Sequence, residues 1–311
     1  MKTISLSADV RMAAPSVATI GCFDGIHRGH QLLVRMVLEE ARQRGMVPTV
    51  ITFDRQPRQL FDPSFRPQLL STLEEKEACL REMGVELLVV LPFTKEMAAL
   101  SAEAFMRQVL REQLNVQVLM TGYDNRFGRD RSEGFDDYVR YGKALGMEVV
   151  RGDVVRMDET AAVSSTVIRR LLAEEGRVEL MPDILTRHYA MSGHIVPGEH
   201  IGHELGFPTA NLEPDNADKL IPANGVYAVW ASLEGGKRMP AMMNIGMRPT
   251  FEGHRQTLEV HILEEVGDIY GRRLTVEFVA RLRSEQRFDS REALMKQLGS
   301  DREQALMRLK D

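Results

Sequence analysis

The chain has 311 residues, a length that favours two domains because single hydrophobic cores commonly stop growing near this size. With 43% hydrophobic and 27% charged residues, the composition is that of a globular protein that buries a core. The formal net charge of −5 gives no general attraction to nucleic acid, so phosphate binding has to come from local groups. Two cysteines, without a Cys-x-x-Cys pattern or a Cys/His cluster, exclude a disulfide scaffold and a structural zinc site.

We expect no segment that directs the protein to a membrane or out of the cytoplasm. Its longest apolar run, residues 87–93, is far shorter than the ~20 residues that cross a bilayer. Residues 1–12 include Lys2, Asp9 and Arg11 and have no apolar stretch of the kind found in signal peptides. We therefore expect a cytoplasmic protein that acts on small molecules, with neither nucleic acid nor membrane as a partner. The oligomeric state is left open by the sequence.

The first half of the chain alternates short β-branched runs with amphipathic segments. This alternation is typical of βαβ units and predicts an α/β domain with a doubly wound parallel sheet. Helix starts are marked by Ser101 as an N-cap and by Thr72 with Glu75, which have the spacing of a capping box. The predicted strands span residues 17–21, 47–53, 87–92 and 116–121, and the predicted helices span residues 31–44, 73–83, 102–114 and 135–145.

The pattern changes at residues 177–183, where Met181-Pro182-Asp183 interrupts the helical period. A domain boundary is predicted there, which gives an N-terminal domain of residues 1–183 and a C-terminal domain of residues 184–311. Closely spaced strands in the second half are typical of a small β-barrel, and helical periodicity at the chain end predicts a closing helix on its outside. The strands are predicted at residues 189–196, 225–231, 241–245, 257–263 and 273–280, and the helix at residues 290–309.

The first candidate site is residues 21–30, Gly-Cys-Phe-Asp-Gly-Ile-His-Arg-Gly-His, between a predicted strand and a predicted helix. Its two histidines face one way at a helix N-terminus, where free backbone N–H groups favour a polyphosphate. Gly29 lets the backbone approach phosphates without an intervening Cβ. Paired histidines at a helix start also occur as ordinary caps, but the full ten-residue string favours a site that stabilises a charged phosphoryl transition state.

This string resembles the signature of the flavin-nucleotide adenylyltransferases, a branch of the HxGH nucleotidyltransferase superfamily. Residues 121–131 and 163–169 are similar to two further motifs of that family, in the same order. The resemblance implies transfer of AMP from ATP to FMN without a covalent intermediate, with His27 and His30 on the triphosphate and Arg169 on the leaving pyrophosphate. It also implies ATP-binding roles for Gly21, Phe23, Asp24, Gly29, Ser164, Ser165 and Thr166, and flavin-binding roles for Asp124, Asn125, Phe127 and Arg131.

The second candidate site is a glycine-rich loop in residues 193–211 that ends in Pro-Thr-Ala-Asn. Glycines at intervals, followed by neighbouring oxygen donors, can wrap a nucleotide and hold a hard cation through Thr209 and Asn211. Glycine-rich turns are common in β-proteins, and the loop could also be structural. Its ending, however, resembles the signature of the riboflavin kinases, and so do the neighbouring segments at residues 225–227, 244–251, 259 and 270–271.

The second resemblance implies a six-stranded barrel that phosphorylates riboflavin. Thr209 and Asn211 would contact Mg²⁺ and ATP, while Glu259 would accept the proton of the riboflavin 5′-hydroxyl as that oxygen attacks the γ-phosphorus. The remaining implied ligands are Gly193, Gly198, Gly202 and Pro208 for ATP, and Asn244 for the flavin. Together the two resemblances imply a bacterial-type bifunctional riboflavin kinase and FMN adenylyltransferase, with Mg²⁺, with ATP as co-substrate, and with riboflavin, FMN and FAD as substrates and products.

Three departures from the family patterns keep alternatives open. Gln56 stands where the adenylyltransferases usually have histidine, and Asn125 where an aromatic residue is usual. His203 lies in a stretch that carries arginine or lysine in many riboflavin kinases. A kinase with altered or lost adenylyltransferase activity is therefore a second hypothesis, and a flavin-sensing regulator is a third. P-loop, Gly-x-Gly-x-x-Gly and His-Glu-x-x-His patterns do not occur, which removes support for P-loop ATPases, Rossmann dehydrogenases and zinc proteases.

Overall fold

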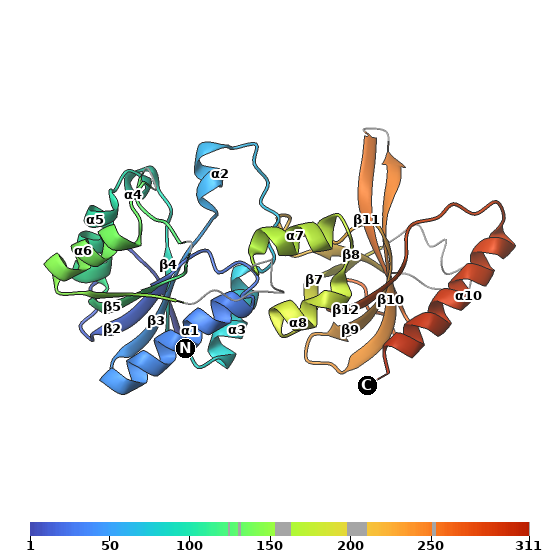
Figure 1. Cartoon of the computed structure of the whole chain (residues 1–311). Coiled ribbons are helices and arrows are strands. Elements are labelled where there is room, and N and C mark those ends of the chain that lie inside the picture. The colour runs from blue at the N-terminus through green and yellow to red at the C-terminus, as the bar shows by residue number, and fades with distance from the viewer. Residues whose placement is uncertain (124, 130–131, 153–162, 198–209, 251–252, 311) are drawn as a thin grey trace. The chain divides into compact units, whose positions relative to one another are not determined.

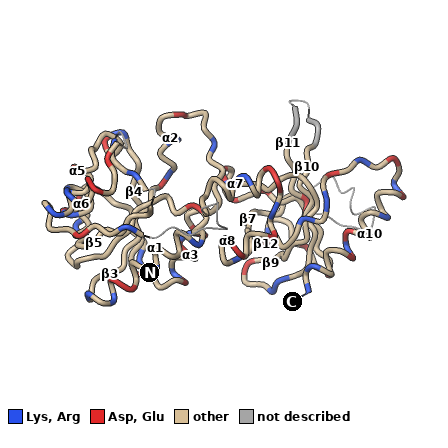
Figure 2. Tube along the Cα trace, in the orientation of Figure 1, with Lys and Arg blue, Asp and Glu red and all other residues tan. Residues whose placement is uncertain are grey.

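The computed structural model describes residues 1–123, 125–129, 132–152, 163–197, 210–250 and 253–310. The chain forms two compact units, Met1–Ser165 and Thr166–Asp311 (Figure 1). Lysine and arginine are interspersed with aspartate and glutamate along both units (Figure 2), as expected for a chain whose charges nearly balance.

The first unit is built on a six-stranded parallel sheet with the order β1-β4-β3-β2-β5-β6. Every residue of β2 and of β4 is buried, as expected for inner strands of a sheet that is covered on both faces. The chain runs from β2 outward through β3 to β4, and then crosses back to β5 on the other side of β2. The strands are β1 (Lys2–Ser5), β2 (Ser16–Ile20), β3 (Val47–Phe53), β4 (Leu87–Leu91), β5 (Val116–Thr121) and β6 (Glu148–Arg151).

Two apolar clusters cover the two faces of this sheet. One joins α1 and α3 to strand residues such as Val17 and Val50, and the other joins α5, η1 and α6 to their chain neighbours Ala18 and Ile51. Because successive strand residues point to opposite faces, this division makes the sheet doubly wound, as predicted. The helices are α1 (Arg28–Arg44), α2 (Pro57–Phe61), α3 (Leu73–Glu82), α4 (Lys95–Ala98), α5 (Ala102–Phe105), its π-helical continuation η1 (Met106–Gln113) and α6 (Phe135–Leu145).

The second unit is a closed antiparallel barrel with the order β10-β11-β8-β7-β12-β9. The predicted barrel is therefore confirmed. Its strands are β7 (Tyr189–Val196), β8 (Ala210–Pro214), β9 (Gly225–Leu233), β10 (Arg238–Thr250), β11 (Gly253–Ile262) and β12 (Arg273–Arg283), and its helices are α7 (Ser165–Ala173), η2 (Val178–Leu180), α8 (Met181–Leu185) and α10 (Arg291–Arg308).

The compact units divide between residues 165 and 166, upstream of the boundary predicted at residue 183. Within the second unit, the end of α7 and the segment after it are bonded to the barrel. The backbone carbonyl of Leu172 accepts the N–H of Ala223 at 2.9 Å, and that of Glu175 accepts a bond from Arg281 Nη1 at 3.2 Å. The division of function at residue 183 stays a prediction, whereas the packing assigns most of α7 to the barrel unit.

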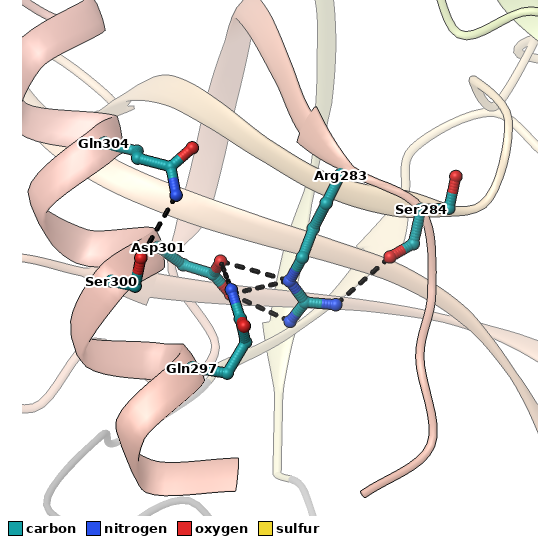
Figure 3. A network of polar contacts seen from close by, with 6 residues as sticks. All are labelled: Arg283, Ser284, Gln297, Ser300, Asp301 and Gln304. Atoms are coloured by element: carbon teal, nitrogen blue, oxygen red, sulfur yellow. Dashed lines mark hydrogen bonds and ion pairs between the residues drawn. The ribbon is translucent and has the colours of Figure 1, made fainter. Parts of the chain in front are cut away.

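A buried ion pair fastens α10 to the barrel (Figure 3). Asp301 is fully buried on α10 and accepts bonds from Arg283, at the end of β12, with Nε–Oδ1 and Nη2–Oδ2 distances of 3.1 and 2.8 Å. Gln297 Nε2 donates to the same carboxylate at 2.8 Å. The bidentate geometry and the additional amide donor satisfy a carboxylate that has no access to water.

We expect Asp301→Ala to lower the free energy of unfolding of the barrel by about 3–5 kcal/mol, because it leaves the Arg283 guanidinium poorly solvated and unpaired. The measurement is urea unfolding followed by the fluorescence of Trp230, the single tryptophan of the chain, on β9. Glu303→Ala, at an exposed position of the same helix, is the matched control. A loss below about 1 kcal/mol for Asp301→Ala would show that the pair does not hold the helix.

Candidate active sites

The loop between β2 and α1 places two histidines at the carboxyl edge of the parallel sheet. Its backbone is unusual, because Phe23, Gly25 and Ile26 have φ angles of +47°, +81° and +41°. Left-handed conformations of this kind are costly for the side chains of Phe23 and Ile26, both of which are buried. Such a loop persists only where its surroundings hold it in place.

Several hydrogen bonds hold this loop. Asp24 Oδ1 accepts the backbone N–H groups of Leu70 and Ser71 at 2.9 and 3.0 Å, and Ser71 Oγ accepts the N–H of Gly25 at 2.9 Å. The hydroxyl of Ser165 donates to the Asp24 carbonyl oxygen at 2.9 Å, which brings the third sequence motif to the first. The Asp24 carboxylate thus fastens the loop to the segment before α3, and its expected role toward ATP stays a prediction.

His27 and His30 lie against each other at the start of α1. Their rings stack with centroids 3.7 Å apart and an interplanar angle of 20°, and the Phe23 ring lies 5.1 Å from that of His30. Gly29 separates them along the first turn. His27 is buried and occupies the N-cap position, but its side chain makes no capping bond to the helix. The first-turn N–H groups therefore lack the N-cap side-chain acceptor that many helices have, a feature suited to an anion.

The electrostatic surroundings of His30 disfavour its charged form. The pKa of His30 lies well below its usual value, first because of burial and then because of the positive potentials of His27 and Lys76. Its Nδ1 atom is buried and has no hydrogen-bond partner among the described residues. At neutral pH, His30 is therefore a neutral imidazole that can donate from one nitrogen only.

The second motif of this half follows β5, the neighbour of β2. Asn125 Nδ2 donates to the carbonyl oxygen of Ile20, the last residue of β2. Phe127 stacks on Tyr138 at 4.1 Å and 11°, which makes its ring part of the core on that face of the sheet. The strand order reverses between β2 and β5, and ligands of open α/β sheets bind at such switch points.

Other predicted residues of the adenylyltransferase motifs have these positions. Gly21 donates its N–H to the carbonyl oxygen of Ile51 at 3.0 Å. Ser164 precedes α7, whereas Thr166 and Arg169 lie on α7 within the second compact unit. Gln56, the departure from the family pattern, is the N-cap of α2. Asp124 and Arg131 lie outside the described residues.

In the barrel, three polar residues lie side by side on adjacent strands. The register pairs Asn211 of β8 with Glu259 of β11, and Glu259 with Asn244 of β10. Residues directly opposite in an antiparallel pair share a face of the sheet, so these side chains form one polar row. All three are half-buried. Amide and carboxylate oxygens are ligands that Mg²⁺ prefers, so the row fits the expected cation.

A second carboxylate, not expected from the sequence, lies beside this row. Glu285 Oε1 lies 2.7 Å from the point that a Cβ at Gly246 would occupy, and Gly246 is two residues from Asn244 on β10. The other oxygen of Glu285 accepts a bond from Asn224 at 3.4 Å, and Asn224 accepts one from Gln256 at 3.2 Å. A polar network thus continues from the row toward the loop that precedes α10.

Gly193, predicted to bind ATP, has a packing role on β7. A Cβ there would lie 2.2 Å from the backbone oxygen of Glu213, so the approach of β7 to β8 requires a glycine. Its expected role toward ATP stays a prediction. Gly198, Gly202, Pro208 and Thr209 lie outside the described residues, as does His203.

Models of known families match both units. The FAD synthetase family matches residues 10–167, and the riboflavin kinase family matches residues 185–309. The bifunctional riboflavin kinase/FMN adenylyltransferase of Escherichia coli (strain K12) is 38% identical over 285 residues, which cover 92% of this chain and 90% of that protein. The chain belongs to the bifunctional riboflavin kinase/FMN adenylyltransferase family.

More distant relatives agree over nearly the whole chain. The protein of the same name from Bacillus subtilis (strain 168) is 31% identical over 317 residues and covers 98% of each chain. A crystal structure titled "macrolide-efflux protein", from Streptococcus pneumoniae, is 32% identical, with a TM-score of 0.89 and 98% of each chain covered. The predicted family and the predicted α/β-plus-barrel fold are confirmed. Among the described residues of this family member, no helix has the length and apolar character needed to cross a membrane.

Proposed function

We propose that the barrel unit phosphorylates riboflavin to FMN and that the first unit transfers AMP from ATP to FMN, which gives FAD and pyrophosphate. One observation carries both steps. The chain holds two separate polar arrangements, a histidine loop at the switch point of a parallel sheet and an Asn211–Glu259–Asn244 row in a barrel, and each is suited to a phosphate reaction. Membership of the family supports the same two activities. We also propose that the protein acts in the cytoplasm on small molecules and does not bind nucleic acid.

In the first unit, adenylyl transfer requires that a phosphate oxygen of FMN attack the α-phosphorus of ATP while the bond to pyrophosphate breaks. The open N–H groups of α1, together with His27 and His30, would hold the triphosphate. Negative charge on the bound phosphates would raise the pKa of His30, so that its ring gains a proton as the nucleotide binds. Arg169 would pair with the leaving pyrophosphate, and the segment around Asn125 and Phe127 would contact the flavin.

In the barrel, the 5′-hydroxyl of riboflavin attacks the γ-phosphorus of ATP and ADP leaves. The hydroxyl proton would pass to a carboxylate oxygen of Glu259, the central residue of the polar row. Asn244 would orient the flavin beside it. Thr209 and Asn211 would hold Mg²⁺, which when bound would neutralise phosphate charge.

The observed bond from Asn125 to β2 favours keeping the second hypothesis, a kinase whose first unit has altered activity. That amide fastens the segment after β5 to the end of β2, at a position where the family usually has an aromatic residue. Incubation of the full chain with riboflavin and Mg-ATP, with riboflavin, FMN and FAD separated, distinguishes the three possibilities. We expect FAD, whereas FMN alone would support the kinase hypothesis and neither product would support a flavin sensor.

We expect His30→Ala to lower FAD formation from FMN by roughly 10²-fold or more, the usual cost of losing one preorganised charge-stabilising group. Riboflavin phosphorylation by the same preparation is the internal control and should persist, because Glu259 and its row belong to the other unit. FAD formation within a few-fold of wild type would contradict the role given to His30.

The variant Glu259→Gln keeps the side-chain shape but removes the proton acceptor, so the rate of riboflavin phosphorylation should fall by about 10² to 10⁴-fold. FAD formation from added FMN should be unchanged. Glu264→Gln, at a surface carboxylate paired with Lys237 next to the same strand, provides the matched control. If Glu259→Gln phosphorylates riboflavin at the normal rate, another group accepts the proton.

Separate fragments test the division of function. Residues 1–183 should make FAD from FMN without phosphorylating riboflavin, and residues 166–311 should do the reverse. The two fragments share α7 and the residues that follow it. Ser165, the first residue of α7, bonds Asp24, whereas Leu172 and Glu175 bond residues of the barrel unit. Cooperative unfolding verifies that each fragment is folded, and activity is measured by product separation. Folded fragments that regain activity only when mixed would show that the sites are shared.

A further inference from the structure

Lys76, on α3, is a buried lysine that belongs to none of the sequence motifs. It is 8% exposed, and its Nζ donates to the carbonyl oxygen of Cys22 at 2.7 Å and to Thr52 Oγ1 at 3.3 Å. It forms no ion pair among the described residues. Burial lowers the pKa of Lys76, with the charge of Asp24 acting in the opposite direction. Because a neutral donor would satisfy this carbonyl at lower desolvation cost, the presence of a charge there calls for a reason.

The acceptor of this bond is the residue that precedes the left-handed segment of the histidine loop. The Cys22 carbonyl oxygen receives a second bond from Thr52 Oγ1, at 3.2 Å, so two donors converge on it. On the far side of Phe23, Asp24 and Gly25 are fastened to the segment just before α3. The residues around α3 therefore hold the loop on both sides of its first strained residue.

The charge of Lys76 also acts on the histidines themselves. Burial is the largest cause that lowers the pKa of His30, and the charges of His27, from the loop, and of Lys76, from α3, lower it further. Lys76 thus has two effects: it holds the loop backbone through Cys22, and its charge influences the protonation of His30.

We propose that Lys76 is a positioning residue for adenylyl transfer: its ammonium fixes the Cys22 carbonyl, and so the loop that presents His27 and His30, and it places a positive charge behind that loop. The proposal rests on the proposed adenylyltransferase function. That charge adds to the effect of burial in disfavouring the protonated form of His30, and it favours a polyanion in front of the loop. The bond to Cys22 keeps the strained backbone from relaxing between turnovers.

Two substitutions in the full chain separate the bond from the charge. Lys76→Met removes both, and Lys76→Gln removes the charge while it keeps an N–H donor on a side chain that is one bond shorter. We expect kcat/KM for FAD formation from FMN to fall by roughly 10²-fold in Lys76→Met and by roughly tenfold in Lys76→Gln. Riboflavin phosphorylation should stay within twofold of wild type in both. Lys143→Met and Lys143→Gln, at an exposed position on α6, are the matched controls and should leave both activities unchanged.

A second readout does not depend on turnover. The pH midpoint at which the His30 ring signal titrates can be followed by NMR, with the signal assigned by its loss in His30→Gln. This midpoint should rise by about half a pH unit or more in Lys76→Gln. A purely structural lysine would leave that midpoint unmoved. The proposal would be overturned if the wild-type protein makes FAD and both Lys76 variants make it at the same rate. An unchanged pKa of His30 in Lys76→Gln would also overturn it. A wild-type protein that makes no FAD would instead overturn the proposed function, and the titration would still report whether the charge acts on His30.

Discussion

The strained turn between β2 and α1 is the constraint on which the first unit depends. Three of its residues have positive φ, and two of these are bulky and buried. The turn has to be tight, because it brings the first N–H groups of α1 and both histidine rings to the edge of the sheet where the strand order reverses. Its strain is offset by bonds from residues 52, 70, 71, 76 and 165, all outside the turn. The site is thus built by the sheet and by α3 as much as by its own motif.

In the barrel, the strand register, and not a strained turn, positions the polar side chains. Asn211, Glu259 and Asn244 come from three strands and lie in one row because the ladders of β8, β11 and β10 are aligned there. A shift of one residue in either ladder would send one of the three to the opposite face. The polar row therefore depends on closure of the barrel. The fastening of α10 through Asp301 acts at the end of β12, where that strand leaves the barrel for the helix.

Elements with strong periodicity could be predicted from the sequence, and weakly patterned ones could not. The predicted helix 135–145 is α6, with the predicted bounds, and the barrel strand 189–196 is β7. The short strands β1 and β6 were not predicted, because their residues are mostly exposed or half-buried and show no apolar run. Strand β8 was missed for a related reason: it has five residues and ends in a proline. The predicted helix 102–114 exists, but most of it is π-helical, which side-chain periodicity does not reveal.

The site residues divide in the same way. His27, His30, Glu259 and Asn211 could be singled out because they lie in contiguous motifs, whose spacing is visible in one dimension. Lys76 and Glu285 could not, since each lies far along the chain from the residues that it approaches. A lysine on an amphipathic helix is ordinarily exposed, and the pattern around Lys76 contains no sign that its ammonium is buried under a loop 54 residues away. Proximity of this kind becomes visible only in the folded chain.

The two sites are proposed to bind the same nucleotide with opposite electrostatics. The histidine loop offers a helix N-terminus, two imidazoles and a buried ammonium, which are positive or can become positive, so the protein itself provides most of the compensation for phosphate charge. The barrel row offers two neutral amides and a carboxylate, and the negative charge of that carboxylate repels a polyphosphate unless a hard cation lies between them. A chain with a net charge of −5 can thus have two proposed ATP sites, because each site relies on its local groups and not on the net charge of the protein. The difference follows the chemistry. A hydroxyl nucleophile needs a nearby base, and the proposed base in the barrel is a carboxylate, whereas the phosphate of FMN arrives already ionised and needs only neighbours that tolerate its charge.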